Sequence, residues 1–205
     1  MESLVSLFFA ALVGFGHAFE ADHLLAVSSL VTRRQSTQTA VKDGIYWGLG
    51  HSSTIFLVGL IMIVGKSTLL NGHFHHFEAV VGVALVVLGA HRLYRMRRSP
   101  HPEPRASEPG YQVAYSVGLI HGLAGSGTMV LLVMSEMEGV AESLAYLLVF
   151  GVGSVAGMLT AAGVFSLPFA RKIAHRHASL RTGFVLLSSL LCLGYGSWII
   201  VKNLA

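Results

Sequence analysis

Six long stretches of mainly apolar residues follow one another along the 205-residue chain, with shorter polar segments between them. Each stretch has about the 20 residues that an α-helix needs to cross the hydrocarbon core of a bilayer. The pattern predicts an all-α, polytopic membrane protein in which the whole chain, residues 1–205, forms a single domain. The predicted spans are residues 3–31, 44–65, 76–95, 111–134, 141–169 and 182–201.

Composition supports this prediction. Apolar residues make up 53% of the chain and charged residues only 12%, whereas soluble domains carry roughly a quarter of charged residues. Cys192 is the single cysteine, which excludes an intrachain disulfide and a cysteine-cluster metal site. The first apolar run carries Glu2 where a signal peptide would have a basic segment, so we interpret it as the beginning of the first span.

The basic residues are distributed unevenly between the two sides of the predicted bundle. Twelve of the 14 lysines and arginines lie in the first, third and fifth connections, whereas Lys66 and Lys202 lie on the opposite side. Cytoplasmic loops of membrane proteins are enriched in lysine and arginine. The distribution therefore predicts a protein of the plasma (inner) membrane with both termini outside. The net charge of +4 reflects this topology and does not indicate nucleic-acid binding.

The chain divides into two halves of three predicted spans each. Residues 96–110 are rich in proline and polar residues and are predicted to form a cytoplasmic linker. Short segments can be aligned between the halves, and three spans per half would make the repeat inverted, an architecture of transporters with a substrate site at broken helices near the midplane. The alternative is chance similarity, because glycine is common in membrane helices. The aligned segments pair Gly14 with Gly118, His17 with His121, residues 48–52 with 151–155, and residues 88–94 with 193–199.

The segment "GHAFEADHLL" places four ionisable side chains inside the first span: His17, Glu20, Asp22 and His23. Ionisable residues within a bilayer are rare and mark ion or substrate pathways. On a regular helix, Asp22 lies about 140° and His23 about 240° around the axis from His17. Either the backbone unwinds around residues 18–21, or only part of the set converges. Gly14 and Gly16 favour a local break.

Imidazole and carboxylate groups suit borderline divalent metals such as Ni²⁺, Co²⁺ or Zn²⁺. His17, Asp22 and His23 are therefore candidate metal ligands. For Glu20 three roles remain open: a ligand, a partner that orients a histidine, or a residue of the metal path. His51, beside Ser52 in the second span, and His121 in the fourth extend the set to four histidines on three spans. Taken singly, each of these two regions also fits close helix packing through small residues.

Three motifs resemble those of the nickel/cobalt permease family, in its shorter branch associated with urease or hydrogenase maturation. They are "HAFEADH" in the first span, "LGHSSTIF" in the second and "HGLAGSGTMVLL" in the fourth. The resemblance implies a permease in which His17, Asp22, His23 and His51 match the metal-binding positions. The chain differs from the family in carrying Glu20 where aspartate is usual, and in showing six spans where longer members have eight.

A histidine-rich segment, "NGHFHHFE", lies in the second connection, outside in the predicted topology. His73, His75 and His76 are candidates for capturing metal before transport, and the alternative is a solvated loop in which histidines occur by chance.

The leading hypothesis is a nickel permease, with cobalt as a further substrate, that carries out uptake. The metal ion is the transported substrate, no cofactor is predicted, and the environment is the lipid bilayer. Efflux through the same ligands is the alternative within this class. An intramembrane hydrolase is disfavoured because "HAFEADH" is not the HExxH pattern of zinc hydrolases. A docking partner in urease maturation is a further alternative, but histidines inside the spans favour transport. We therefore do not expect an enzyme.

Overall fold

The computed structural model describes residues 2–32, 34, 36–65, 74–98, 110–136, 139–169 and 178–204. Within these ranges all regular structure is helical and no strand occurs, which confirms the all-α prediction. The histidine-rich segment is covered only in part, because His73 and the side chain of His75 lie outside the described residues. Most of the predicted linker, residues 99–109, also lies outside them.

The helices extend beyond several of the predicted spans. The second predicted span, for example, begins at Thr37 rather than at residue 44, because the polar first turns of this helix carry no apolar signal. The elements are α1 (Glu2–His17), α2 (Ala21–Val31), α3 (Thr37–Gly65), α4 (Phe74–Arg98), α5 (Gly110–Glu136), α6 (Val140–Ser166), the 3₁₀ turn η1 (Leu167–Phe169) and α8 (Ala178–Leu204).

The first predicted span is broken into two helices. Helix α1 ends at His17, α2 begins at Ala21, and the two axes are bent by 58°. This break lies at the residues where the sequence predicted unwinding. It leaves His17 at the end of α1 and places Asp22 and His23 in the first turn of α2.

The outer surface is apolar, as expected for a protein that faces lipid. Leu4, Phe8, Val152 and Trp198 are each more than half exposed. Among the described residues, four helices are long and apolar enough to cross a membrane, and the count rises to five if the bent pair α1–α2 forms one span. The four are α3, α4, α6 and α8. The structure thus supports an integral membrane protein.

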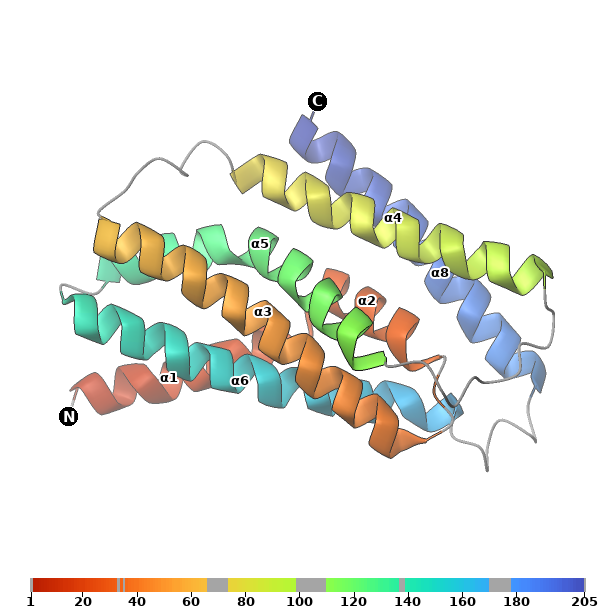
Figure 1. Ribbon diagram of the computed structural model, residues 1–205, viewed down its shortest axis with the longest axis horizontal. Helices are drawn as coiled ribbons and strands as arrows, with labels where there is room; N and C mark the ends of the chain where they lie inside the picture. The colour runs from red at the N-terminus through yellow and green to blue at the C-terminus, as the bar shows by residue number, and fades with distance from the viewer. Residues whose placement is uncertain are drawn as a thin grey trace.

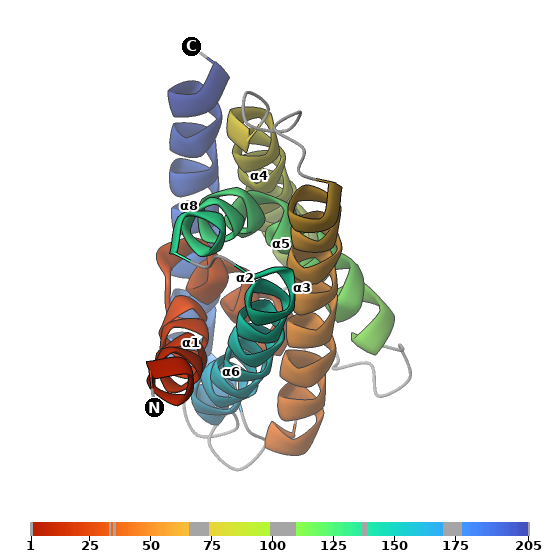
Figure 2. The ribbon, with the colours of Figure 1, turned by 90° about the vertical axis from the view of Figure 1, so that its left-hand side faces the viewer.

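Helices α1, α3, α5 and α6 form one group, and α4 packs along α8 beside it (Figure 1). Viewed from the end, α2 lies between the two groups (Figure 2). The ends of α2, α4 and α6 and the beginnings of α3, α5 and α8 lie towards the same side, on the right in Figure 1. From α2 onwards, consecutive α-helices therefore alternate in direction, whereas α2 continues in the general direction of α1.

Glycines set the closest helix contacts. A Cβ atom at Gly14 would overlap the carbonyl group of Phe150, so α1 and α6 touch through their backbones. In the same way, a Cβ atom at Gly118 would overlap the carbonyl oxygen of Trp47, where α5 crosses α3. Small residues permit this close approach of membrane helices. Helices α1 and α3 both pack against α6, and the end of α1 lies close to the middle of α3.

Two polar contacts fix the C-terminal end of α2. The Arg34 guanidinium, just after α2, donates two hydrogen bonds to the Asp43 carboxylate in α3, one of them 3.0 Å long. Arg92 of α4 is buried and donates from one nitrogen to the hydroxyl groups of Ser29 in α2 and Ser188 in α8, at 3.1 and 3.0 Å. These contacts fix the orientation of α2, which carries His23.

Candidate metal centre

The break between α1 and α2 determines the directions of the histidine side chains in the motif. The amide of Phe19 donates to the carbonyl oxygen of Gly16, and the amide of Glu20 donates to that of His17, so the chain turns tightly after α1. Glu20 then adopts an extended backbone (φ −65°, ψ 156°) before α2 begins. As a result, His17 leaves the end of one helix and His23 leaves the first turn of the next, and both rings reach the same interior space.

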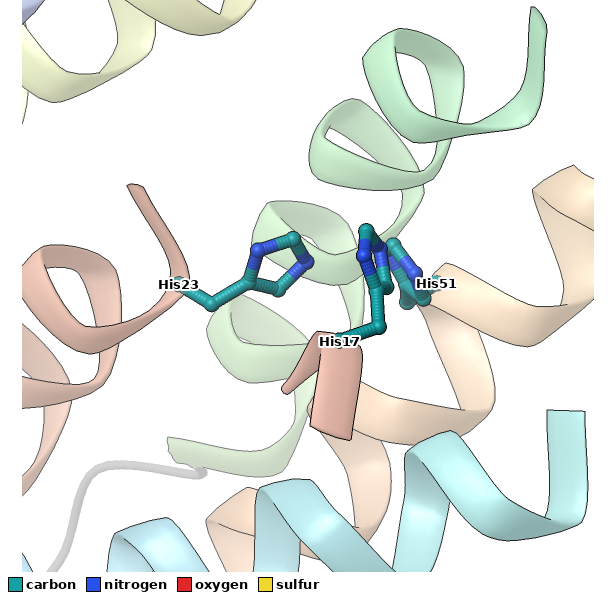
Figure 3. Close-up of side chains that lie close together, drawn as sticks. All are labelled: His17, His23 and His51. Atoms are coloured by element: carbon teal, nitrogen blue, oxygen red, sulfur yellow. The ribbon is translucent and has the colours of Figure 1, made fainter. Parts of the chain in front are cut away.

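Three imidazoles meet there from three helices (Figure 3). The His17 ring centroid lies 4.6 Å from that of His23 and 5.2 Å from that of His51, which comes from α3. One ligand atom from each of the three side chains lies within 4.8 Å of the others. All three side chains are buried, and His51 is completely inaccessible to solvent. The arrangement is that of a group able to hold a metal ion.

The ring nitrogens of these histidines are incompletely paired. Nε2 of His17, Nε2 of His23 and both nitrogens of His51 are buried and have no hydrogen-bond partner. A buried polar atom without a partner costs about 1–3 kcal/mol, so structures retain such atoms where something else uses them. Unprotonated imidazole nitrogens are preferred ligands of nickel, cobalt and zinc.

The two carboxylates of the motif contact the other ring nitrogen, Nδ1, of His17 and of His23. Oε1 of Glu20 lies 2.8 Å from Nδ1 of His17, and Oδ1 of Asp22 lies 3.0 Å from Nδ1 of His23. Asp22 is partly buried, whereas the Glu20 side chain is 59% exposed. Glu20, Asp22 and His23 also form a second group with ligand atoms within 4.8 Å of one another.

His121 of α5 lies at the edge of the cluster. Its ring is completely buried, its centroid is 5.8 Å from that of His23, and its Nδ1–H donates to the carbonyl oxygen of Val117 at 2.9 Å. Nε2 of His121 is buried without a partner. His121 is not part of the metal-compatible group that the other three histidines form.

Three further residues at or near the cluster were not predicted from the sequence. The Trp47 ring lies 5.6 Å from that of His23, and the Phe150 ring lies 5.6 Å from that of His17. Ser154, one turn after Phe150 on α6, is fully buried and its hydroxyl has no partner. The alignment of the two halves contained the signal for Ser154, because it pairs this residue with His51.

Two other candidates have different surroundings. The Ser52 hydroxyl donates to the carbonyl oxygen of Gly151 at 3.1 Å, so it joins α3 to α6. His76 is exposed in the first turns of α4. It belongs to neither metal-compatible group found among the described residues.

Comparison with known proteins agrees with this chemistry. The model of a family described as high-affinity nickel-transport protein (NicO) matches residues 4–94, which include α2, α3 and most of α1 and α4. This segment contains His17, His23 and His51. No solved structure matches the chain significantly.

Several curated proteins are similar to the chain. It is 34% identical over 189 residues to the urease accessory protein UreH of Bacillus sp. (strain TB-90), a match that covers 84% of this chain and 83% of that protein. It is 25% identical over 182 residues to the chloroplast protein FOR GROWTH AND FERTILITY 1 of Arabidopsis thaliana, covering 76% of this chain and 48% of that protein.

A third relative is the high-affinity nickel transport protein of Cupriavidus necator, 30% identical over 122 residues, which are 55% of this chain and 34% of that protein. The chain thus spans half or less of the length of the second and third relatives, but most of the first. The family match, the extent of the similarity to UreH and the motif residues gathered in the buried cluster lead to one conclusion: the chain belongs to the family of high-affinity nickel-transport proteins.

Proposed function

We propose that this protein is a permease of the plasma (inner) membrane that takes up Ni²⁺, and also Co²⁺, through a buried site built on His17, His23 and His51. Asp22, in contact with His23, belongs to the same site, and His121 is placed to join it as the ion moves. The relationship to UreH supports a link between this uptake and the maturation of a nickel enzyme.

The unpartnered ring nitrogens carry this proposal. Three histidines from α1, α2 and α3 present buried nitrogen atoms to one another without any hydrogen-bond partner among the described residues. In an apolar bundle this arrangement is costly unless the nitrogens bind a ligand for part of the cycle. A site made of neutral nitrogen atoms selects borderline divalent metals over Mg²⁺ or Ca²⁺, which prefer oxygen.

The position of the cluster also favours transport over storage. Helix α1 ends beside the cluster, and α2 begins beside it after the break. Broken helices with such ends are used by transporters to hold ions near the bilayer midplane. A membrane potential that is negative inside contributes about 2.3 kcal/mol per elementary charge per 100 mV to the entry of a cation.

The distribution of charge supports the proposed orientation. Arg34, Arg95, Arg97 and Arg98 lie at the side where α2 and α4 end. On the other side, Glu142 lies in the first turn of α6 and Glu78 is the fifth residue of α4. Excess basic charge marks the cytoplasmic side. The orientation therefore places both ends of the described chain outside, with His76 on the outer side, where it and its neighbours in the histidine-rich segment would meet incoming metal.

Matched helix contacts support the proposal of six spans in an inverted repeat, with α1 and α2 as one broken span and α5 as the fourth. The alignment of the halves pairs Gly14 with Gly118 and, extended by one residue, Phe150 with Trp47. Gly14 approaches the carbonyl of Phe150, and Gly118 approaches that of Trp47. Each contact joins one half to the other, and exchanging the halves turns one contact into the other.

A second pair of contacts obeys the same rule. Gly153 approaches the carbonyl oxygen of Ala11, and Gly50 approaches that of Tyr115. The alignment pairs Gly153 with Gly50 and, extended by three residues before Gly14, Ala11 with Tyr115. Chance glycine similarity would not place the contacting carbonyls at aligned positions. The repeat also relates His17 to His121, so the metal site would lie close to the axis that exchanges the halves.

Flux into liposomes tests the proposed function. The purified protein is reconstituted with a metal-sensitive dye inside, and Ni²⁺ is added outside with and without an inside-negative potential. We expect Ni²⁺ entry that the potential accelerates and that His17→Ala and His51→Ala abolish, while Ser53→Ala, at an exposed position two residues from His51, retains it. Absence of Ni²⁺ and Co²⁺ flux under every gradient, with the protein folded, would overturn the proposal. Flux only from inside to outside would replace uptake by efflux.

A further inference from the structure

The two carboxylates of the motif contact Nδ1 of His17 and of His23, whereas the unpartnered nitrogen of each ring is Nε2. A carboxylate accepts hydrogen bonds and has no proton to give, so Nδ1 of each ring must be the donor. Glu20 therefore receives Nδ1–H of His17 over 2.8 Å, and Asp22 receives Nδ1–H of His23 over 3.0 Å. A neutral imidazole with its proton on Nδ1 carries a lone pair on Nε2.

In both rings, the nitrogen that keeps the lone pair is also the nitrogen that is buried without a partner. Nε2 of His17 and Nε2 of His23 have no hydrogen-bond partner. His121 has the same protonation pattern, because its Nδ1 lies against the carbonyl oxygen of Val117, which can only accept. Its Nε2 is likewise buried without a partner. Three histidines on three helices thus share one tautomer.

The local backbone shows that Glu20 is used for this purpose. Glu20 is the residue that precedes α2, where a side chain would ordinarily accept a hydrogen bond from the free amides of the first turn. Its side chain makes no such capping bond and instead reaches back across the break to His17. The break between α1 and α2 is therefore spanned by a side-chain contact that orients the last residue of α1.

We propose that Glu20 and Asp22 are positioning residues, not metal ligands: they fix His17 and His23 in the tautomer whose Nε2 lone pairs, together with His51, bind the ion. This inference rests on the proposed function and assigns the atoms of its site. Hydrogen bonds from ligand histidines to carboxylates hold the rings in place and make the free nitrogen more basic. The carboxylates also supply negative charge beside a divalent ion without binding it.

The competing arrangement is a direct site at Glu20, Asp22 and His23. To use it, the ion would have to take Nδ1 of His23 and displace the Asp22 hydrogen bond, or bind through carboxylates alone. Nε2 of His23 would then remain buried and unpaired, as would that of His17. The positioning arrangement uses these nitrogens and keeps both existing hydrogen bonds.

The tautomers can be measured without metal. In protein labelled with ¹⁵N-histidine, ring-nitrogen shifts distinguish protonated from unprotonated nitrogens, and the signals are assigned by single His→Gln variants. We expect Nδ1–H with unprotonated Nε2 for His17, His23 and His121. In Glu20→Ala the preference of His17 should be lost while that of His121 is retained. Protonated Nε2 on His17 and His23 in the unsubstituted protein would overturn the inference.

Metal binding then separates positioning from ligation. We expect Glu20→Ala and Asp22→Ala to weaken Ni²⁺ binding by about 10–100-fold, the usual effect of removing such a partner. Glu20→Gln and Asp22→Asn should recover part of the loss, because an amide oxygen can still accept from Nδ1–H. The exposed Glu142 provides the matched control, and Glu142→Gln should bind as the unsubstituted protein does.

X-ray absorption at the nickel edge identifies the ligands directly. If the carboxylates only position the histidines, no carboxylate binds Ni²⁺ in the unsubstituted protein or in Asp22→Asn. The number of imidazoles bound to Ni²⁺ is then the same in both proteins. Loss of a carboxylate ligand in Asp22→Asn or Glu20→Gln would overturn the inference while leaving the permease intact. Absence of Ni²⁺ binding in the unsubstituted protein would instead overturn the proposed function, and the positioning role with it.

Discussion

His23 and His51 meet edge to face, with ring centroids 4.9 Å apart and planes at 84°, although they lie on α2 and α3. Both rings are buried, and neither Nε2 atom has a hydrogen-bond partner. The 58° bend between α1 and α2 allows His17 to join this pair, since on a straight helix His23 would lie about 240° around the axis from His17. The bend thus converts three separate positions in the sequence into one group.

Removing the His51 imidazole should stabilise the metal-free protein. Neither ring nitrogen of this completely buried residue is paired, so His51→Leu replaces an unsatisfied polar group by an apolar one of similar size. We expect a gain of about 1 kcal/mol, seen as a higher thermal midpoint in detergent without metal. The same variant should lose the further rise in midpoint that saturating Ni²⁺ gives the unsubstituted protein.

A suitable comparison is His121→Leu. That substitution removes a hydrogen bond to the carbonyl oxygen of Val117, so its gain without metal should be smaller than that of His51→Leu. A lower midpoint for metal-free His51→Leu would show that His51 is a structural residue with a partner in solution.

Gly14 should not tolerate a side chain. A Cβ atom there would overlap the backbone of Phe150, which cannot move without separating α1 from α6. We expect Gly14→Ala to lower stability by at least about 2 kcal/mol, together with a loss of Ni²⁺ binding because His17 shifts with α1. Thermal unfolding and Ni²⁺ titration of the same preparation measure both effects.

Gly194 serves as the matched control for this prediction. It lies in α8, and a Cβ atom at this position would meet nothing within 4 Å. Gly194→Ala should be neutral or stabilising by up to about 1 kcal/mol, since alanine favours a helix over glycine. Equal effects of the two substitutions would contradict the close contact between α1 and α6.

Much of this fold follows from the sequence, for identifiable reasons. Apolar runs long enough to span a bilayer predicted helices at the right places, and the angular separation of His17, Asp22 and His23 predicted a break where α1 in fact ends. The ends of the helices were less accurate: α3 begins at Thr37, because its first polar turns look like a loop when hydrophobicity alone is considered. Six spans, the inverted repeat and the termini outside stay predictions.

Metal binding should weaken as the pH falls. Imidazole binds metal only when it is deprotonated, so protons and Ni²⁺ compete for the same nitrogen atoms. The complex holds fewer protons than the metal-free protein in acid, and its affinity therefore decreases with decreasing pH. Calorimetry in buffers of different ionisation enthalpy should show proton release on Ni²⁺ binding at the acidic end of the range in which the protein stays folded. A Kd that stays constant as the pH is lowered through the whole range in which the protein remains folded would exclude a site made mainly of histidines.

The contact between Arg34 and Asp43 should contribute to the stability of the end of α2. Both side chains are largely buried, with 15% and 6% of their surface exposed. Asp43→Asn leaves the guanidinium without its charged partner, and removal of one member of a buried pair costs about 3 kcal/mol. A double-mutant cycle of Asp43→Asn with Arg34→Gln should give a coupling energy well above that of an exposed pair. A coupling near zero would show that the contact is solvent-screened.

The candidate site could be predicted only in part, because it depends on contacts between helices. Residue types and spacing identified His17, Asp22, His23 and His51, but not which atoms face one another. The contact of Asp22 with Nδ1 of His23 depends on side-chain orientation, and the Phe150 ring against His17 depends on the glycine contacts that set the distance between α1 and α6. The metal-binding role of these residues stays a prediction.

The position of bound nickel tests the central claim most directly. Anomalous scattering at the nickel absorption edge, recorded from crystals of the Ni²⁺-loaded protein, locates the ion independently of any assumption about its ligands. We predict one strong peak within about 2.2 Å of Nε2 of His17 and Nε2 of His23, the range in which imidazole holds such ions, with His51 as the third ligand. A peak at the carboxylates of Glu20 and Asp22, or no peak among the buried histidines at saturating Ni²⁺, would contradict the account.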